Sequence, residues 1–124
     1  MTIAEVAKRY GLTTDTLRYY ERVGLLPVIG RMASGIRNYT ESDCEWVSYI
    51  KCMRSAGVSV ETLVEYVRLF RQGPETLARR KQLLIEQRRQ IAGRIESLTE
   101  VLRRLDKKLD GFEADLARYE ENLK

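Results

Sequence analysis

The 124-residue chain has no histidine, only two prolines and only two cysteines. The absence of histidine removes the commonest general base of enzymes and the commonest metal ligand. Two prolines and eight glycines are too few for the many turns of a β-sandwich or barrel. Two cysteines cannot build a disulfide framework, and they fit a reducing compartment better than an oxidising one. The missing residues therefore argue against a β-sandwich or barrel and against a site that depends on histidine.

Long apolar runs are also missing, so we expect no segment to span a membrane. The N-terminus lacks the charged and then apolar pattern of a signal segment, and this predicts a cytoplasmic protein. The hydrophobic content of 44% is sufficient for a modest core. The length fits one ordinary domain, or a small domain with an extended element.

Charge is distributed unevenly along the chain. Residues 79–108 carry ten basic and four acidic side chains, a net of +6, whereas residues 109–124 carry two basic and five acidic ones, a net of −3. The whole chain has a net charge of +4, which alone is weak support for a polyanionic partner. A solvated helix surface is the simpler explanation of the excess in 79–108.

The first 24 residues have the pattern of two short helices. Thr2 with Glu5 three positions later forms a capping box, and Gly11 is expected to end the helix that follows. Thr13 is expected to cap a second helix that ends near Gly24. Two short helices joined by a tight turn containing glycine predict a helix-turn-helix.

The next part predicts a hairpin and then two more helices. Residues 28–39 are expected to form a small β-hairpin. Its first arm contains Val28 and Ile29, its turn is Ala33-Ser34-Gly35, and its second arm is residues 36–39. Thr40 is expected to cap a helix that Gly57 closes, and Ser59 a helix that ends at Gly73. The expected inward residues are Trp46, Val47, Ile50 and Met53 in the first helix and Val60, Leu63, Val64, Val67 and Phe70 in the second.

The remainder has the heptad pattern of one long coiled-coil helix. Lys81 and Arg88 weaken the start of the apolar seam, and Gly111 is a candidate break. An apolar stripe on a protruding helix must be buried against a partner, and a second copy is the simplest partner. We therefore expect a homodimer, with antiparallel pairing as a hypothesis that heptads alone cannot decide. The residues expected to mediate dimerisation are Leu84, Ile91, Ile95, Leu98, Leu102, Leu105 and Leu109.

Together these elements predict an all-α fold with a small β-hairpin wing: a winged helix-turn-helix DNA-binding domain followed by a long dimerisation helix. A pure coiled-coil interaction protein is the alternative, but it explains only the seam. Any single arginine is most often just solvated, and one ring of the Tyr19-Tyr20 pair is expected in the core. The candidate contacts to double-stranded DNA are Thr14, Asp15, Thr16, Arg18, Tyr19, Tyr20, Arg31, Arg37 and Tyr39.

The sequence resembles the MerR family of bacterial transcription regulators. The resemblance lies in residues 16–27 (TLRYYERVGLLP), in the Gly-x-Arg-x-Tyr segment at 35–39 and in residues 51–59 (KCMRSAGVS). It implies a DNA-binding domain over residues 1–72 and a dimerisation helix with a short C-terminal segment over 75–124. Ile36 and the Val28-Ile29-Gly30 spacing depart from the commonest family pattern.

The resemblance also implies a mechanism. MerR-like dimers bind a near-palindrome in a promoter spacer and distort the DNA so that RNA polymerase can engage both promoter elements. Arg18, Tyr19 and Tyr20 would then hold the recognition helix on the duplex, and Arg37 and Tyr39 would belong to the wing. On this basis the protein is expected not to be an enzyme and to need no cofactor.

Cys52 is the candidate effector-sensing residue. On an ideal helix it lies off the centre of the apolar face, and taken alone it is more simply a small structural hydrophobe. The segment around it resembles the family branch that responds to reactive aldehydes and to nitrosative stress, in which the matching cysteine is the proposed sensor. A regulator with a non-thiol small-molecule effector stays open as an alternative. A thiol enzyme is disfavoured because no base is available to Cys52, and a metal site because no cysteine follows it.

Overall fold

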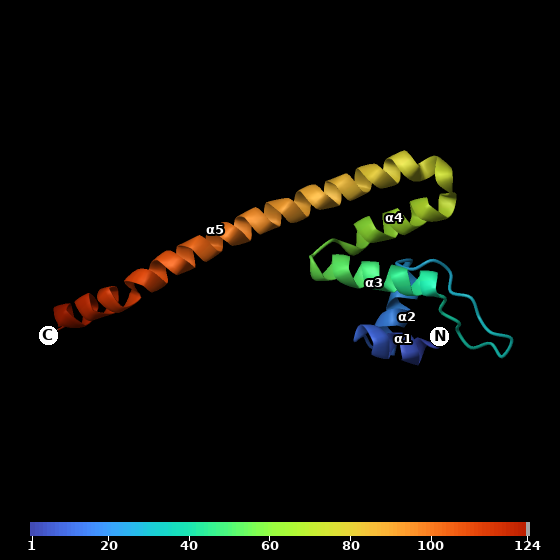
Figure 1. Ribbon diagram of the computed structural model, residues 1–124, viewed down its shortest axis with the longest axis horizontal. Coiled ribbons are helices and arrows are strands. Elements are labelled where there is room, and N and C mark those ends of the chain that lie inside the picture. The colour runs from blue at the N-terminus through green and yellow to red at the C-terminus, as the bar shows by residue number, and fades with distance from the viewer. Residues whose placement is uncertain (124) are drawn as a thin grey trace. The chain divides into compact units, whose positions relative to one another are not determined.

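The computed structural model describes residues 1–123, which are mostly helical (Figure 1). The chain divides into two compact units, Met1–Ile85 and a second unit that begins at Glu86. None of the helices in the described residues combines the length and the apolar character needed to cross a bilayer. The elements are α1 (Ile3–Tyr10), α2 (Thr14–Val23), α3 (Glu41–Ser55), α4 (Val60–Gln72), the short 3-10 helix η1 (Pro74–Thr76) and α5 (Leu77–Leu123).

The helix starts lie where the capping residues predict them. Thr2 and Thr40 form complete capping boxes, with Glu5 and Asp43 as their respective partners. The side chain of Thr13 accepts a hydrogen bond from the backbone N–H of Thr16, and Ser59 caps α4 in the same way. These side chains satisfy backbone donors that a helix start would otherwise leave unpaired.

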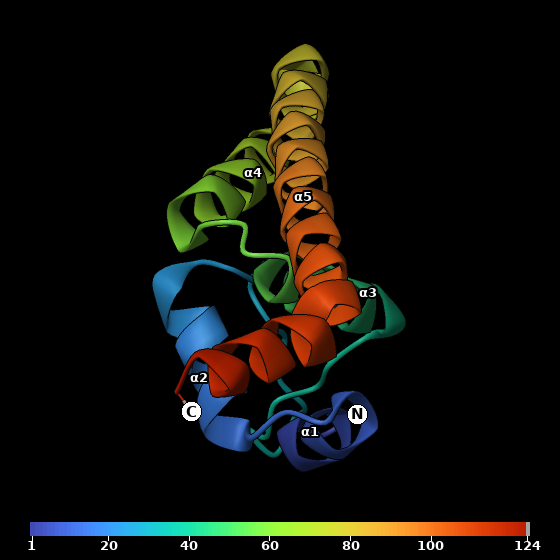
Figure 2. The same cartoon turned by 90° about the vertical axis from the view of Figure 1, so that its left-hand side faces the viewer.

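The core of the first unit lies where α1 and α2 meet α3 and α4. Figure 2 shows α1 and α2 as two short helices that cross and are joined by a tight turn. Gly11 makes this turn with a φ of 65°, a left-handed conformation that residues other than glycine rarely adopt. The fully buried side chains include Val6, Leu17, Leu25, Leu26, Val47, Ile50, Leu63, Val67 and Leu69.

The segment between α2 and α3 is a loop with one antiparallel β-bridge, between Arg31 and Arg37. The predicted β-hairpin wing is therefore present only as this bridge, and residues 1–123 contain no named strand. The N–H of Met32 donates to the carbonyl of Ile36 at 2.7 Å, and Gly35 turns the chain with a φ of 86°. Two arms this short support little ladder pairing.

Two details differ from the expectations for α3 and α4. Helix α3 ends at Ser55 with Ala56 as its C-cap, one residue before the expected Gly57. Phe70 does not point inward as expected, because 43% of its surface is exposed. The buried face of α4 is formed instead by Leu63, Val67 and Leu69, which leaves Phe70 on the adjacent face.

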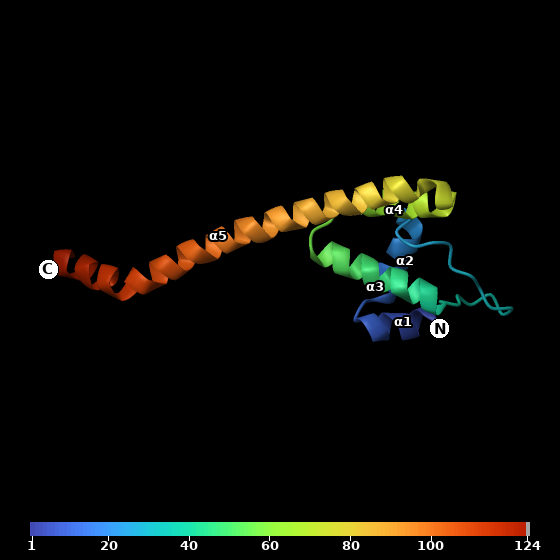
Figure 3. The same ribbon diagram turned by 45° about the horizontal axis from the view of Figure 1, so that its top comes forward.

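Helix α5 is continuous from Leu77 to Leu123, so neither Gly93 nor Gly111 breaks it. Figure 3 shows that it bends toward its C-terminal end. In the second unit the helix carries a row of exposed apolar side chains that includes Ile95, 60% exposed, and Leu109, 69% exposed. The other exposed members of the row in this unit are Leu98, Leu102, Leu105, Phe112, Leu116, Tyr119 and Leu123.

Candidate nucleic-acid interface

Helix α2 presents a polar face because its apolar side chains are directed into the core. Leu17 is fully buried and Tyr20 nearly so, which confirms that one ring of the Tyr19-Tyr20 pair is a core residue. Asp15, Arg18 and Tyr19 lie on the exposed side. Short polar and cationic side chains on the second helix of a helix-turn-helix can reach base edges and phosphates.

Arg18 is held by two residues of the preceding turn. Its Nη1 donates to Asp15 Oδ1 at 3.0 Å and to Thr14 Oγ1 at 3.4 Å. About half of the Arg18 side chain stays exposed, and Asp15 is almost fully exposed. Such a pair contributes little to stability. It orients the guanidinium along the exposed face of α2, and a phosphate could replace the carboxylate as its partner.

Tyr19 and Arg22 form a second exposed pair on α2. The Arg22 guanidinium carbon lies 5.5 Å from the centroid of the Tyr19 ring, a cation–π arrangement. The ring is 37% exposed and lies 6.3 Å from the ring of Tyr20. The Tyr19 side chain is therefore fixed between a buried ring and a cation, with one edge open to solvent.

Glu21 connects α2 to the loop that follows it. Its carboxylate accepts hydrogen bonds from Arg37 Nε at 2.9 and 3.2 Å and from the Tyr39 hydroxyl at 3.1 Å. Tyr39 is buried, and burial together with the nearby Glu21 charge raises the pKa of its hydroxyl well above the ordinary value. The expected site residues Arg37 and Tyr39 thus both pair with Glu21, a residue to which the sequence pattern assigned no separate role.

A hollow of about 380 Å³ lies between α2, the loop and the end of α4. Arg31 borders it and donates to the carbonyl of Gly35 at 2.8 Å, whereas Arg71 donates to the carbonyl of Leu26 at 2.7 Å. Three arginines and one glutamate therefore line the same hollow, and the excess positive charge suits an anion. The lining residues are Glu21, Leu26, Pro27, Val28, Ile29, Arg31, Arg37 and Arg71.

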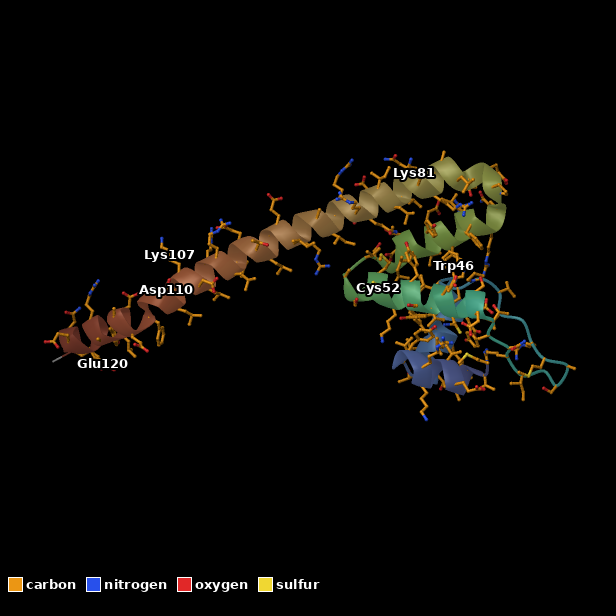
Figure 4. The ribbon with its side chains drawn as sticks, viewed as in Figure 1. Trp46, Cys52, Lys81, Lys107, Asp110 and Glu120 are labelled. Atoms are coloured by element: carbon orange, nitrogen blue, oxygen red, sulfur yellow. The ribbon has the colours of Figure 1, made fainter. Side chains whose placement is uncertain are left out.

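The two cysteines have different environments. Cys44 is buried near the start of α3, with its sulfur 3.9 Å from that of Met1. Cys52 is exposed near the end of α3, and its carbonyl accepts a hydrogen bond from the Ser55 hydroxyl (Figure 4). Lys51 points away, since its ammonium caps the C-terminal end of α1 at the carbonyl of Tyr10. No group of three or more potential metal ligands occurs within residues 1–123.

A model of the MerR HTH family of regulatory proteins matches residues 1–69, more than half of the chain. The chain belongs to the MerR family. The resemblance in the sequence and the helix-turn-helix in the structure are thereby confirmed.

Several MerR relatives are similar over most of the chain. A MerR family transcriptional regulator from Listeria monocytogenes has a TM-score of 0.89 and 42% identity, covering all of this chain and 94% of that one. HiNmlR, a MerR family regulator without a sensor domain that was crystallised on promoter DNA, has a TM-score of 0.85 and 30% identity over 94% of this chain and 92% of its own. The Bacillus subtilis transcriptional regulator AdhR is 54% identical over 91 residues, which are 73% of this chain but only 65% of AdhR.

Sequence reasoning missed Glu21 and Arg71 as parts of this candidate site. Glu21 follows the buried Leu17 by one helical turn, so a carboxylate at that position borders the core. A charge there requires a partner, and this signal could have indicated a cation nearby. Arg71 gives no such signal, because it meets the loop only through the tertiary fold.

Proposed function

We propose that this chain regulates transcription by binding double-stranded promoter DNA as a homodimer. The observation that carries the proposal is the similarity to HiNmlR over almost the whole chain, because that MerR regulator was crystallised on promoter DNA. The exposed polar face of α2 adds a physical reason, since it has the residue types that contact bases and phosphates.

In this proposal α2 is the recognition helix and enters the major groove. Thr14, Asp15, Thr16 and Arg18 face the bases and the phosphate backbone, with Tyr19 at the edge of the same face. The loop after α2 acts as the wing, where Arg31 contacts phosphate.

Tyr20 and Tyr39 have a different part in the proposal, because both rings are buried. Tyr20 anchors α2 in the core, and Tyr39 fixes the end of the wing against Glu21. Arg37 uses its Nε for Glu21, and its terminal nitrogens are assigned to phosphate. The wing is thus positioned through α2 rather than through a β-ladder.

The second subunit is proposed to cover the apolar row on α5. A row of exposed leucines on one helix is stable in water only when a partner buries it. Residues 79–108 carry a net charge of +6 and residues 109–124 a net of −3. Antiparallel pairing places the basic end of each helix beside the acidic end of the other, so we favour that orientation.

Activation is proposed to follow the MerR mechanism that the resemblance implies. The dimer would distort the promoter spacer so that RNA polymerase engages both promoter elements, which is recognition through DNA deformation. The protein itself would then catalyse no reaction, in keeping with relatives that are transcriptional regulators.

Cys52 is proposed as the sensor of a reactive aldehyde or of nitrosative or oxidative stress. Of the two cysteines, Cys52 is the exposed one. The region similar to AdhR includes the segment around Cys52 that resembles the aldehyde-responsive branch of the family. A thiol adds to an aldehyde carbon by forming a C–S bond, while the carbonyl oxygen takes up the proton that the sulfur gives up. The adduct would add a polar group on the surface of α3.

The test of DNA binding is fluorescence anisotropy with a labelled duplex from the promoter upstream of the protein's own gene. We expect tight binding, and the logarithm of the affinity should fall linearly with the logarithm of the salt concentration, because phosphate contacts release counterions. A scrambled duplex of the same length is the control and should bind at least about a thousandfold more weakly. Equal binding to both duplexes, or to neither, would contradict the proposal.

A further inference from the structure

A short connection joins α4 to α5, and the DNA-binding face proposed above does not include it. Helix α4 ends at Gln72, α5 begins at Leu77, and η1 lies between them. The chain turns back sharply here (Figure 1). Gly73 has a φ of 106°, a conformation that residues other than glycine rarely adopt. We call residues 73–76 the α4–α5 joint. A glycine turn is free to bend unless other contacts hold it.

Thr76 is a buried polar side chain within the joint, and only 8% of it is exposed. Its hydroxyl oxygen lies 2.7 Å from the carbonyl oxygen of Leu69 and 2.8 Å from that of Gly73, and it donates to both. The last carbonyl groups of a helix have no partner within that helix, so the hydroxyl supplies one for α4. One side chain therefore closes the end of α4 and holds the glycine turn.

Arg80, in the first turn of α5, holds the joint from the other side. Its Nε donates to the Thr76 hydroxyl oxygen at 3.1 Å, and its Nη2 donates to the carbonyl of Gly73 at 3.4 Å. Its guanidinium carbon also lies 5.5 Å from the centroid of the Phe70 ring, which belongs to α4. The planar guanidinium can satisfy such contacts only in a narrow range of orientations. Arg80 therefore fixes the first turn of α5 to the end of α4.

Helix α4 is in turn fixed to the recognition helix. Its residues Leu63 and Val67 are fully buried in the core of the first unit. Arg71 Nη2 donates to the carbonyl of Leu26, shortly after the end of α2, at 2.7 Å. Close packing of this kind allows little independent movement. The orientation of the first turns of α5 relative to α2 therefore depends on the joint.

We propose that the α4–α5 joint, through Thr76 and Arg80, determines which spacing of operator half-sites the dimer accepts. The inference rests on the proposed function, because it names what sets the operator spacing of a DNA-binding dimer. Helix α5 is continuous, and the proposed contacts with the second copy lie farther along it. A joint that fixes its first turns thereby fixes the separation of the two recognition helices, which has to match the half-site spacing. Thr76 and Arg80 are positioning residues, because neither is assigned a DNA contact.

The test compares the affinities of two duplexes by fluorescence anisotropy. One is the fragment from the protein's own promoter. The other has one base pair inserted at the centre of the near-palindrome, which moves one half-site by about 3.4 Å and rotates it by about 35°. We expect the unmodified chain to bind the second duplex at least about tenfold more weakly, a penalty like that of one mismatched base pair.

Two variants loosen the joint and a third restores it. Thr76→Val removes the hydroxyl but keeps the branched shape, and Arg80→Ala removes the guanidinium that bonds to it. In both variants the preference for the original spacing should fall below about threefold, because each DNA-binding domain can then follow its own half-site. Thr76→Ser keeps the hydroxyl and should restore the preference of the unmodified chain.

Arg79→Ala is the matched control, because it removes an equal charge from the neighbouring residue of α5. Arg79 forms an exposed ion pair with Glu65 of α4, with 3.3 Å between nitrogen and oxygen, and such pairs constrain a structure little. The control should keep the spacing preference, and any effect of the lost charge should weaken both duplexes equally. Thermal unfolding checks that each variant is folded. If Thr76→Val does not fold, Arg80→Ala against Arg79→Ala decides the test.

Three results would overturn the role of the joint. The first is an unchanged spacing preference in folded Arg80→Ala. The second is an equal loss of affinity for both duplexes in the joint variants, which is what a merely structural defect produces. The third is an unmodified chain that binds both spacings equally tightly. A scrambled duplex tests the proposed function separately: a chain that binds it as well as the promoter would refute promoter binding, and this inference with it.

Discussion

Glu21 and Arg37 form a half-buried ion pair that joins the second helix of the helix-turn-helix to the loop after it. Arg37 Nε donates to both carboxylate oxygens, at 2.9 and 3.2 Å, across sixteen residues of chain. The Tyr39 hydroxyl donates to the same carboxylate. One side chain of α2 therefore holds the loop at two points, in a segment with only one β-bridge.

Replacing Glu21 by Gln should loosen the loop. The amide keeps one acceptor but loses the charge, which should lower the free energy of unfolding by about 1–2 kcal/mol and weaken promoter binding. Chemical denaturation and anisotropy measure the two effects. Glu65→Gln, which breaks an exposed pair with Arg68 on α4, is the control and should change neither appreciably. Promoter affinity unchanged in Glu21→Gln would show that the loop needs no such anchor.

Tyr39 should make the protein sensitive to alkaline pH. Its pKa is raised in the folded state by burial, so the folded form holds the hydroxyl proton more tightly than the unfolded chain. The stabilising effect is complete below about pH 10 and is lost as the pH rises above that value. Stability measured from pH 9 to 12 should fall less steeply in Tyr39→Phe, by up to about 1.4 kcal/mol per pH unit. Parallel curves would refute this role of the hydroxyl.

Arg18→Ala should abolish tight promoter binding and leave the dimer intact. If Arg18 contacts a phosphate, the variant should also reduce the slope of log affinity against log salt by about 0.9. Anisotropy at several salt concentrations and sedimentation of the free protein give both quantities. Arg68→Ala removes an equal charge from α4 and should bind normally. Tight binding by Arg18→Ala would mean that α2 does not dock as proposed.

Leu98→Asp should convert the dimer to monomers, because it places a charge in the apolar row of α5. Ser97→Asp adds the same charge to the adjacent residue, about 100° around the helix, and should stay dimeric. Sedimentation velocity at micromolar concentration distinguishes the two masses. An unchanged mass for Leu98→Asp would count against the seam.

Cys52→Ser should retain promoter binding but remove induction by aldehydes in a reporter strain. The hydroxyl has nearly the same size, whereas it is a much weaker nucleophile than the thiol. Cys44→Ala removes the buried thiol and should keep the induction. If Cys52→Ser is still induced, the effector acts at another place on the protein.

The helices were predictable because their signals are local. Thr2, Thr13, Thr40 and Ser59 each cap the helix expected from the next few residues, and Gly11 turns as only glycine readily does. The heptad pattern likewise predicted the long helix, with Gly111 as a candidate break. In the structure the helix continues through Gly111.

The tertiary contacts were not predictable in this way. The partner of Glu21 lies beyond an irregular loop, where no periodicity sets the register. Phe70 fits the inward stripe of α4, but Leu69 takes the buried position and Phe70 joins Trp46 at the surface. Both outcomes depend on how α2, α3 and α4 pack, which a single sequence does not encode in its spacing.

Native mass spectrometry of the protein with its own promoter fragment counts the chains bound to one duplex. We expect a complex of two chains per duplex that is absent with Arg18→Ala and with Leu98→Asp. A complex of one chain per duplex, or no complex at any salt concentration where the protein stays folded, would contradict it.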